Sequence, residues 1–255
     1  MGPISVTLPL GAVTTTMLAG VRIAAFLLLA PPFSHKAVPG QVKALLAVGL
    51  ALAVRPRLGS AATLSTGEFL LDLVGQAVIG AGLGFLVYLV FAAVESAGGL
   101  VDLFGGFQMA SAFDPLSLTN GATFSRLYQW LALALLVVSG GYRVVLAGLV
   151  RSFDALPLGT FPDPAALAHT AGQGLVDMVV AALQIAGPLL VVLFLADVGL
   201  GLLTRVAPAL NAFAMGFPLK VLLTISLGGM ALLTLPGIVS GLLGDASHAM
   251  QGVTP

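Results

Sequence analysis

Long apolar runs cover most of this 255-residue chain and constrain its fold more than any motif does. Spanning about 30 Å of hydrocarbon at 1.5 Å per residue takes roughly 20 residues. The runs compatible with helices are Leu8–Phe33, Val42–Val54, Phe69–Val94, Leu127–Val150, Leu175–Leu203 and Ala212–Leu235, with a weaker run at Gly237–Met250. Val42–Val54 is too short to span. The pattern therefore predicts an all-α protein whose helices do not reduce to a set of straight spans.

Composition indicates a polytopic membrane protein. Hydrophobic residues make up 58% of the chain, charged residues only 8%, and the mean hydropathy is +1.10. A soluble protein with this much apolar surface would aggregate in water. The ten basic residues balance the ten acidic ones, so we expect no nucleic-acid partner. The absence of cysteine excludes disulfides and thiolate metal sites.

Charged residues stand inside the apolar runs. They are Arg22, Arg143, Asp177, Asp197 and Lys220. A lipid-facing charge there would cost roughly 2.5–3.5 kcal/mol. We expect these groups to pair inside the fold, to be covered by neighbouring subunits, or to lie on helices partly outside the bilayer. Each one alone could also be an interfacial residue that snorkels. Gly75, Gly80 and Gly84 indicate where helices approach closely.

The stretch Glu95–Arg126 is neither apolar enough to span a membrane nor polar enough for an ordinary soluble loop. Its pairs Gly98-Gly99 and Gly105-Gly106 are expected to loosen a helix, and Asp114-Pro115 and Asn120-Gly121 to end it. Irregular backbone at membrane depth must be buried in protein or line a cavity. We interpret residues 105–120 as an internal loop that lines or closes a path. The alternative is a short external connection.

No catalytic pattern is present in the sequence. The three histidines are far apart, and there is no nucleophile elbow, phosphate loop or zinc-protease helix. Asp102, Asp114, Asp177 and Asp197 could form a proton or cation relay, or could be structural caps and ion pairs. We expect no enzyme activity, no metal and no cofactor.

The most specific segment lies near the end of the chain. Pro208 and Pro218 are expected to bracket a polar turn between two apolar helices. The segment resembles the signature of the FliR family, flagellar type III export-gate proteins related to the injectisome SctT proteins. The matching positions are Arg205, Pro208, Asn211, Phe213, Gly216, Phe217, Pro218, Leu219 and Lys220. Ala209 replaces the glutamine usual in that family, which puts in doubt any hydrogen bond made by that glutamine.

The resemblance extends over nearly the whole chain. Its further positions are Arg22, Pro31, Pro39, Lys43, Ala97, Gly98, Asp102, Gly106, Met109, Asp114, Pro115, Ser152, Phe153, Pro157, Asp197 and Gly201. It implies a FliP-like portion over residues 1–170, with a pore-plug loop at 105–120, and a FliQ-like hairpin portion over 171–255. It also implies a helical hetero-oligomeric ring with FliP- and FliQ-like subunits, in contact with FlhB- and FlhA-like export components.

The family resemblance implies a gated conduit for unfolded flagellar proteins. It implies a place in the lipid of the bacterial inner membrane, at the flagellar basal body, with the core raised to the periplasmic side. The residues expected to close the pore are Phe104, Gly105, Gly106, Phe107, Met109 and Phe113. The residues expected to support structure and assembly are Arg22, Asp102, Asp114, Pro115, Asp197, Arg205, Pro208, Asn211, Pro218 and Lys220. The alternative function is a small-molecule or ion transporter that uses the intramembrane aspartates.

Overall fold

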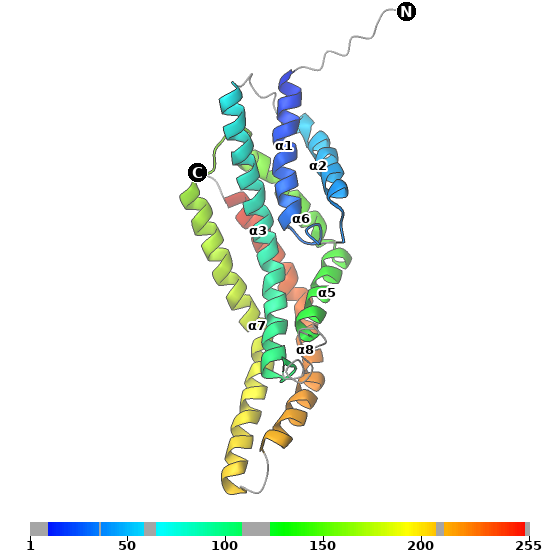
Figure 1. Ribbon diagram of the computed structural model, residues 1–255, viewed down its shortest axis with the longest axis vertical. Coiled ribbons are helices and arrows are strands. Elements are labelled where there is room, and N and C mark those ends of the chain that lie inside the picture. Colours follow the sequence, from blue (N-terminus) through cyan, green and yellow to red (C-terminus); the bar gives the residue numbers. More distant parts are fainter. Residues whose placement is uncertain (1–9, 36, 59–64, 109–122, 208–211, 253–255) are drawn as a thin grey trace, which may run out of the picture. The chain divides into compact units, whose positions relative to one another are not determined.

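The computed structural model describes residues 10–35, 37–58, 65–108, 123–207 and 212–252 (Figure 1). Its elements are α1 (Leu10–Leu29), α2 (Gly40–Val54), the short 3-10 helix η1 (Arg55–Arg57), α3 (Thr66–Phe104), α5 (Thr123–Val138), α6 (Gly141–Ala155), α7 (Pro164–Val206) and α8 (Ala212–Gly252). No strand occurs among these residues. The all-α prediction is confirmed.

Several helices meet the requirements of a membrane span. Among the described residues, Gly11–Leu29, Thr66–Phe104 and Pro164–Val206 are long and apolar enough to cross a bilayer. α7 has 43 residues. It is therefore about 64 Å long at 1.5 Å per residue, roughly twice the hydrocarbon thickness. α2, with 15 residues, is too short to cross. As the sequence predicts, straight spans do not account for the chain.

The predicted single run Leu127–Val150 is wrong. The structure divides it into α5 and α6, which bend by 75° at a short break. Gly140 adopts a left-handed conformation with φ of 70°, which a residue with a side chain rarely takes. The Ser139 hydroxyl accepts a hydrogen bond from the Gly141 amide at 3.3 Å and caps the first turn of α6. A glycine and a capping serine thus end one helix and begin the next.

The prediction that Gly98-Gly99 loosens a helix is also wrong, because α3 continues through both residues to Phe104. A Cβ at Gly98 would lie 2.6 Å from the Phe124 carbonyl oxygen of α5. Glycine therefore serves close helix packing here, and that packing offsets its low helix propensity. The second pair does end the helix, since Gly106 has a φ of +84°.

The expected C-terminal boundaries need correction as well. Gly237–Met250 is not a separate tail, because α8 is one helix of 41 residues that contains Pro218 and Pro236. Pro218 lies within the helix and does not bracket the turn, whereas Pro208 falls outside the described residues. In apolar surroundings an interrupted helix would expose backbone groups without partners, which favours continuing the helix on both sides of a proline.

The chain divides into two compact units. Unit 1 comprises Met1–Tyr88, Tyr142–Gly174 and Leu243–Pro255, and unit 2 comprises Leu89–Gly141 and Leu175–Leu242. In unit 1, α1 packs on α3 through the predicted glycine face. A Cβ at Gly80 would overlap the Arg22 carbonyl, and one at Gly84 would lie 2.8 Å from the Phe26 carbonyl oxygen. Both contacts have the same register, so α1 and α3 run parallel, and α2, which follows α1 in the sequence, packs on α1 (Figure 1).

These glycines give the first testable prediction. We expect Gly80→Ala to lower the free energy of unfolding by about 1–3 kcal/mol, because the added methyl group must displace the α1 backbone. Gly82 is the matched control on the same helix, since a Cβ there would meet only Leu167 at an ordinary 3.6 Å. Gly82→Ala should leave stability unchanged or raise it by up to about 1 kcal/mol. Thermal unfolding in detergent measures both, and equal effects would contradict the packing assignment.

Candidate functional site

Arg22 lies fully buried in the middle of α1 and makes a polar cluster inside unit 1. Its Nε donates to Gln76 Oε1 of α3 at 2.7 Å. Its Nη1 donates to the Ser152 carbonyl oxygen at 2.9 Å, and its Nη2 to the Leu156 carbonyl oxygen at 2.7 Å. The Phe153 ring lies below the guanidinium, 4.3 Å from Cζ to the ring centroid. Within the described residues no carboxylate pairs with Arg22.

The carbonyl acceptors of Arg22 lie at the C-terminal end of α6. The Ser152 carbonyl also accepts the Leu156 amide at 2.9 Å, whereas the Leu156 carbonyl lies just past the helix and has no donor from α6. Both lie at the negative end of the helix dipole. A guanidinium offers a planar fork of donors and favours that negative end. Arg22 therefore acts as a C-terminal cap for α6, supplied by the side chain of another helix. Arg22 is buried and hydrogen-bonded inside the fold, so the alternative of a snorkelling interfacial residue does not hold for it.

Asp102 caps the opposite kind of helix end inside unit 2, the N-terminal end of α5. Its side chain is fully buried near the end of α3. Its two carboxylate oxygens accept hydrogen bonds from the Phe124 and Ser125 amides, each at 2.9 Å. These amides lie in the first turn of α5, where backbone donors have no partners within the helix and the dipole favours an anion. This geometry is that of a capping carboxylate.

Glu95 strengthens the same junction. Its backbone carbonyl accepts a bond from the Ser125 hydroxyl at 3.2 Å, and its carboxylate accepts one from the Gln129 amide at 3.4 Å. As Glu95 precedes Asp102 while Gln129 follows Ser125, the end of α3 and the start of α5 run antiparallel. The junction therefore joins α3 to α5, the two helices that precede and follow residues 109–122 in the sequence.

The turn after α3 contains the described residues of the predicted plug. Phe104 is 39% exposed. The Phe107 ring packs edge-to-face on Phe124 with centroids 5.0 Å apart, a favourable aromatic geometry. A Cβ at Gly105 would lie 2.6 Å from Thr224 Oγ1, and one at Gly106 3.4 Å from the Phe217 ring. The turn is thus packed against α8. The other plug residues, Met109 and Phe113, lie outside the described residues, as do Asp114 and Pro115.

Asp197 and Lys220 connect α7 and α8 within unit 2. Lys220 Nζ lies 2.8 Å from an Asp197 carboxylate oxygen, with about half of the aspartate side chain exposed. A Cβ at Gly216 would lie 3.2 Å from Leu200, in the same antiparallel register. The second half of α7 and the first half of α8 therefore form a helical hairpin (Figure 1). Ion pairing inside the fold, one of the alternatives for the intramembrane charges, accounts for these two residues.

The remaining predicted charges lie on exposed surface. Arg143 is exposed and stacks on its neighbour Tyr142, with Cζ 5.7 Å from the ring centroid. Asp177 and Arg205 are exposed on α7 and have no ion-pair or hydrogen-bond partner in the described part of the chain. Asn211, like Pro208, falls outside the described residues.

Several residues of these clusters carried no sequence signal that singled them out. The sequence alone does not distinguish four of them from other residues of apolar runs and turns: Gln76, Glu95, Phe124 and Thr224. Gln76 offered one usable hint, since a neutral polar side chain in an apolar helix is expensive unless it has a partner. It lies four residues, about one helical turn, before Gly80, on the face of α3 that meets α1.

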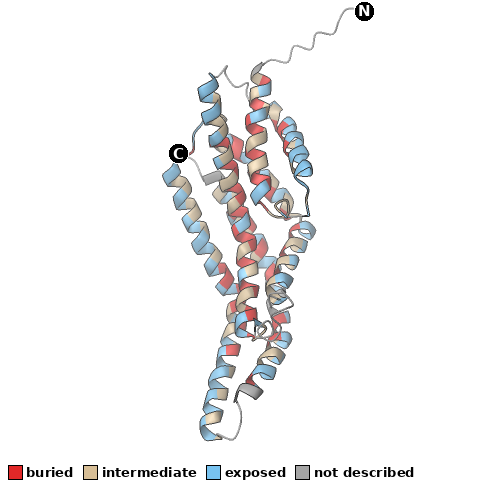
Figure 2. Cartoon of the chain, viewed as in Figure 1, coloured by how far each residue is buried: buried red, intermediate tan, exposed pale blue. Residues whose placement is uncertain are grey.

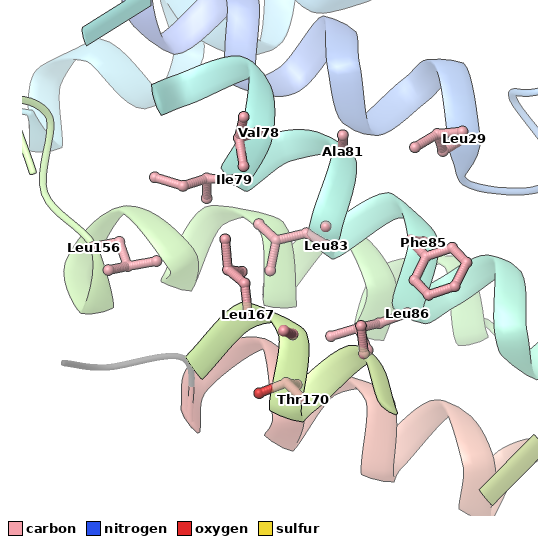
Figure 3. Close-up of a pocket in the computed structure, with 13 residues that line it drawn as sticks. Leu29, Val78, Ile79, Ala81, Leu83, Phe85, Leu86, Leu156, Leu167 and Thr170 are labelled. Carbon is pink, nitrogen blue, oxygen red and sulfur yellow. The ribbon is translucent and has the colours of Figure 1, made fainter. Parts of the chain in front are cut away.

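An apolar cavity of about 440 Å³ lies within unit 1 (Figure 3). Leu83, Leu86 and Leu167 project into it from α3 and α7 (Figure 3). Its polar side chain, Thr170, already donates its hydroxyl hydrogen to the Ala166 carbonyl at 2.9 Å. The cavity has no acid, base or nucleophile in its lining and does not suggest a reaction. No group of three or more potential metal ligands occurs within the described ranges.

These features define a helical membrane protein in which buried charges brace helix ends and two helices form a long hairpin. Residues 13–246 match the family described as Bacterial export proteins, family 1. The chain belongs to this family.

Similarity to individual relatives extends over most of the chain. The flagellar biosynthetic protein FliR of Escherichia coli strain K12 is 36% identical over 210 residues, covering 81% of this chain and 80% of the relative. FliR of Pectobacterium carotovorum is 33% identical over 238 residues, covering 91% and 90%. The Yop proteins translocation protein T of Yersinia pestis is 33% identical over 177 residues, covering 67% of each chain. The FliR resemblance is confirmed.

Arg22 supports a prediction about capping. We expect Arg22→Lys to lower the free energy of unfolding by about 2–4 kcal/mol, because one ammonium cannot replace the fork that reaches Gln76, Ser152 and Leu156. Arg143→Lys is the matched control, since Arg143 is exposed; it should change stability by less than about 0.5 kcal/mol. Thermal unfolding in detergent separates the two. An Arg22→Lys protein as stable as the control would contradict the cap.

Asp102 supports a local prediction. We expect Asp102→Ala to destabilise the protein by about 1–3 kcal/mol, because the buried Phe124 and Ser125 amides lose their acceptor. Asp102→Asn, which keeps one acceptor, should cost less. Hydrogen exchange of the first turn of α5 is the direct measurement, with the exposed Asp154→Ala as control. Unchanged exchange in Asp102→Ala would show that other groups cap α5.

Proposed function

We propose that this chain is a core component of the flagellar type III export gate. In this proposal it forms, with FliP- and FliQ-like subunits, the gated conduit through which unfolded flagellar proteins leave the cell. The observation that carries the proposal is the match of residues 13–246 to a family of bacterial export proteins. The flagellar relatives cover 81% and 91% of the chain and the Yop translocation protein 67%, which favours the flagellar system.

The proposed location is the bacterial inner membrane at the flagellar basal body, with the core raised to the periplasmic side. Helices much longer than a bilayer's hydrocarbon layer support a core that is not confined to it. We assign residues 1–170 to a FliP-like portion and 171–255 to a FliQ-like portion. The α7–α8 hairpin, joined by Asp197 and Lys220, supports the second assignment. FlhB- and FlhA-like components are the further proposed partners, beside the export substrates and lipid.

The gate is proposed to lie at the turn that follows α3. Phe104, Gly105, Gly106 and Phe107, with Met109 and Phe113, would close the pore by apolar packing, which flexible phenylalanine and methionine side chains can make and break. Phe107 already packs edge-to-face on Phe124. The neighbouring Asp102 and Glu95 bonds leave α3 and α5 joined while the turn moves. The other predicted residues are proposed to stabilise the subunit or its assembly. They are Arg22, Asp102, Asp114, Pro115, Asp197, Arg205, Pro208, Asn211, Pro218 and Lys220.

The geometry of two aspartates supports a gate over the alternative ion-coupled transporter. Asp102 is engaged with two backbone amides, and Asp197 with Lys220. A coupling relay requires carboxylates that can exchange their partners during transport. Of the relay candidates in the described part of the chain, only Asp177 has no partner, and a single free carboxylate does not make a relay.

Co-expression of the tagged chain with the FliP- and FliQ-like proteins of its source tests the proposal. We expect a stable hetero-oligomer in mild detergent, detected by the mass of the intact complex. A monomer or homodimer that ignores those subunits would contradict it. In the same complex, replacing Phe107, Met109 and Phe113 with glycine should leave the mass unchanged and allow small solutes to leak across the membrane. Leu45→Gly, an exposed position on α2, is the control for nonspecific leakage.

A further inference from the structure

The short helix α2 of unit 1 presents a wide apolar surface to its surroundings. Its buried residues are Ala47, Ala51 and Val54. From residue 42 to residue 53 its exposed residues are Val42, Ala44, Leu45, Leu46, Val48, Gly49, Leu52 and Ala53, with no polar side chain among them. At about 100° per residue these positions cover an arc of about 200°. α2 is accordingly pale over most of its surface in Figure 2.

The neighbouring helices of unit 1 leave this arc uncovered. A Cβ at Gly20 of α1 would lie 3.9 Å from the Ala51 Cβ of α2, whereas the Arg22 carbonyl of α1 faces Gly80 of α3. Gly20 and Arg22 are two residues apart and therefore point to nearly opposite sides of α1. α2 and α3 thus pack on different sides of α1, and the exposed arc of α2 faces away from both.

Basic side chains stand at both ends of α2. Lys43 lies in its first turn, and Arg55 and Arg57 belong to the 3-10 helix η1 that follows it. Arg57 is exposed, and Lys43 and Arg55 are half-buried. None of these three side chains forms an ion pair or a hydrogen bond within the described part of the chain. The apolar arc therefore ends in cations that have no counter-charge there.

The sequence around α2 is wholly cationic. Residues 1–67 contain five of the ten basic residues and none of the ten acidic ones. The first acidic residue is Glu68, and its carboxylate already accepts hydrogen bonds from the Ser65 amide and hydroxyl, both at 2.8 Å. Basic residues that border an apolar helix surface are typical of segments that meet anionic lipid at the edge of the hydrocarbon layer.

We propose that α2 and η1 form a binding site for an anionic phospholipid. Its acyl chains cover the exposed arc of α2, and its phosphate accepts hydrogen bonds from Arg55 and Arg57. A guanidinium offers a planar fork of donors that matches phosphate oxygens. α2 has 15 residues and is about 22 Å long, shorter than the hydrocarbon layer of about 30 Å. Long basic side chains at its ends extend toward the headgroups and reduce this mismatch.

The width of the arc and the sign of the charges select lipid over a protein partner. One partner helix contacts a narrow stripe, whereas acyl chains cover an arc of any width. A second copy of α2 would bring cations together in either direction, because Lys43 and Arg55 stand at opposite ends of the helix, and like charges repel. Water does not suit an apolar surface of this extent. The inference deepens the proposed function and rests on the membrane location that it includes.

Fluorescence quenching by spin-labelled lipid tests the proposal. The chain contains no cysteine, so Leu52→Cys places a single bimane label at an exposed position three residues before Arg55. The labelled chain is reconstituted with the FliP- and FliQ-like subunits in vesicles of equal parts phosphatidylglycerol and phosphatidylcholine. One preparation carries doxyl acyl chains on phosphatidylglycerol alone, and the other carries them on phosphatidylcholine alone. We expect doxyl-phosphatidylglycerol to quench the label roughly twofold more strongly, because the anionic lipid is enriched beside the arginines.

Charge changes then test the two arginines. Arg55→Gln together with Arg57→Gln should abolish the preference for phosphatidylglycerol and leave the summed quenching of the two preparations unchanged, because the acyl chains still cover α2. Arg143→Gln together with Arg151→Gln, at two exposed positions of unit 1, removes the same charge and should leave the preference intact. Arg55→Lys together with Arg57→Lys should retain at least half of the preference.

Four results would overturn the inference. Absence of quenching in both preparations would show that protein covers α2. Equal quenching would show acyl contact without recognition of the headgroup. A preference that survives in the glutamine pair, or that disappears equally in the lysine pair, would rule out recognition by the charge of Arg55 and Arg57.

The same preparations separate this inference from the proposed function. If the FliP- and FliQ-like subunits assemble with the chain while the label shows no preference, the lipid site fails and the export-gate proposal stands. If those subunits do not assemble with the chain but the reconstituted chain shows the arginine-dependent preference, the lipid site stands and the export-gate proposal fails.

Discussion

The cost of leaving a helix end without partners in apolar surroundings underlies the arrangement of this protein. Arg22 and Asp102 are both fully buried, and neither forms an ion pair within the described residues. Each instead pairs its charge with the opposite partial charge at a helix terminus, the C-terminal end of α6 and the N-terminal end of α5. Two charges that are costly to bury thereby bind the Leu156 carbonyl and the Phe124 and Ser125 amides, which have no partner within their own helices.

The contacts around the turn after α3 differ in kind, and this difference would let the proposed gate move while the helices beside it keep their positions. The Asp102 and Glu95 bonds hold the end of α3 to the start of α5, while Gly106 lies against the Phe217 ring of α8 and Phe107 against the Phe124 ring, both apolar contacts. Directional hydrogen bonds keep one geometry, whereas apolar contacts are non-directional and can be exchanged for others. A junction fixed by hydrogen bonds beside a turn held by apolar contacts is what the proposed gate would require.

The candidate site shows where residue types were informative and where they were not. Arg22, Asp102, Asp197 and Lys220 could be identified because a charge inside an apolar run requires an explanation. Their partners could not, because backbone amides and carbonyls belong to every residue and only the fold decides which ones lie nearby. Gly98 was misjudged for a related reason. Its helix propensity argued for a break, but its lack of a Cβ served the close approach of α5.

Hydropathy and helix-sized apolar runs by themselves determined the class of protein, because they reflect the transfer of side chains into lipid, which depends on composition alone. The ordered motif around Arg205 and Lys220 determined the family. The tertiary structure decided what lies within reach of each polar group. It placed Lys220 beside Asp197, divided the run between Leu127 and Val150 at Gly140, and gave Asp177 and Arg205 no partner among the described residues. Those outcomes depend on contacts between segments far apart in the chain, which local sequence does not encode.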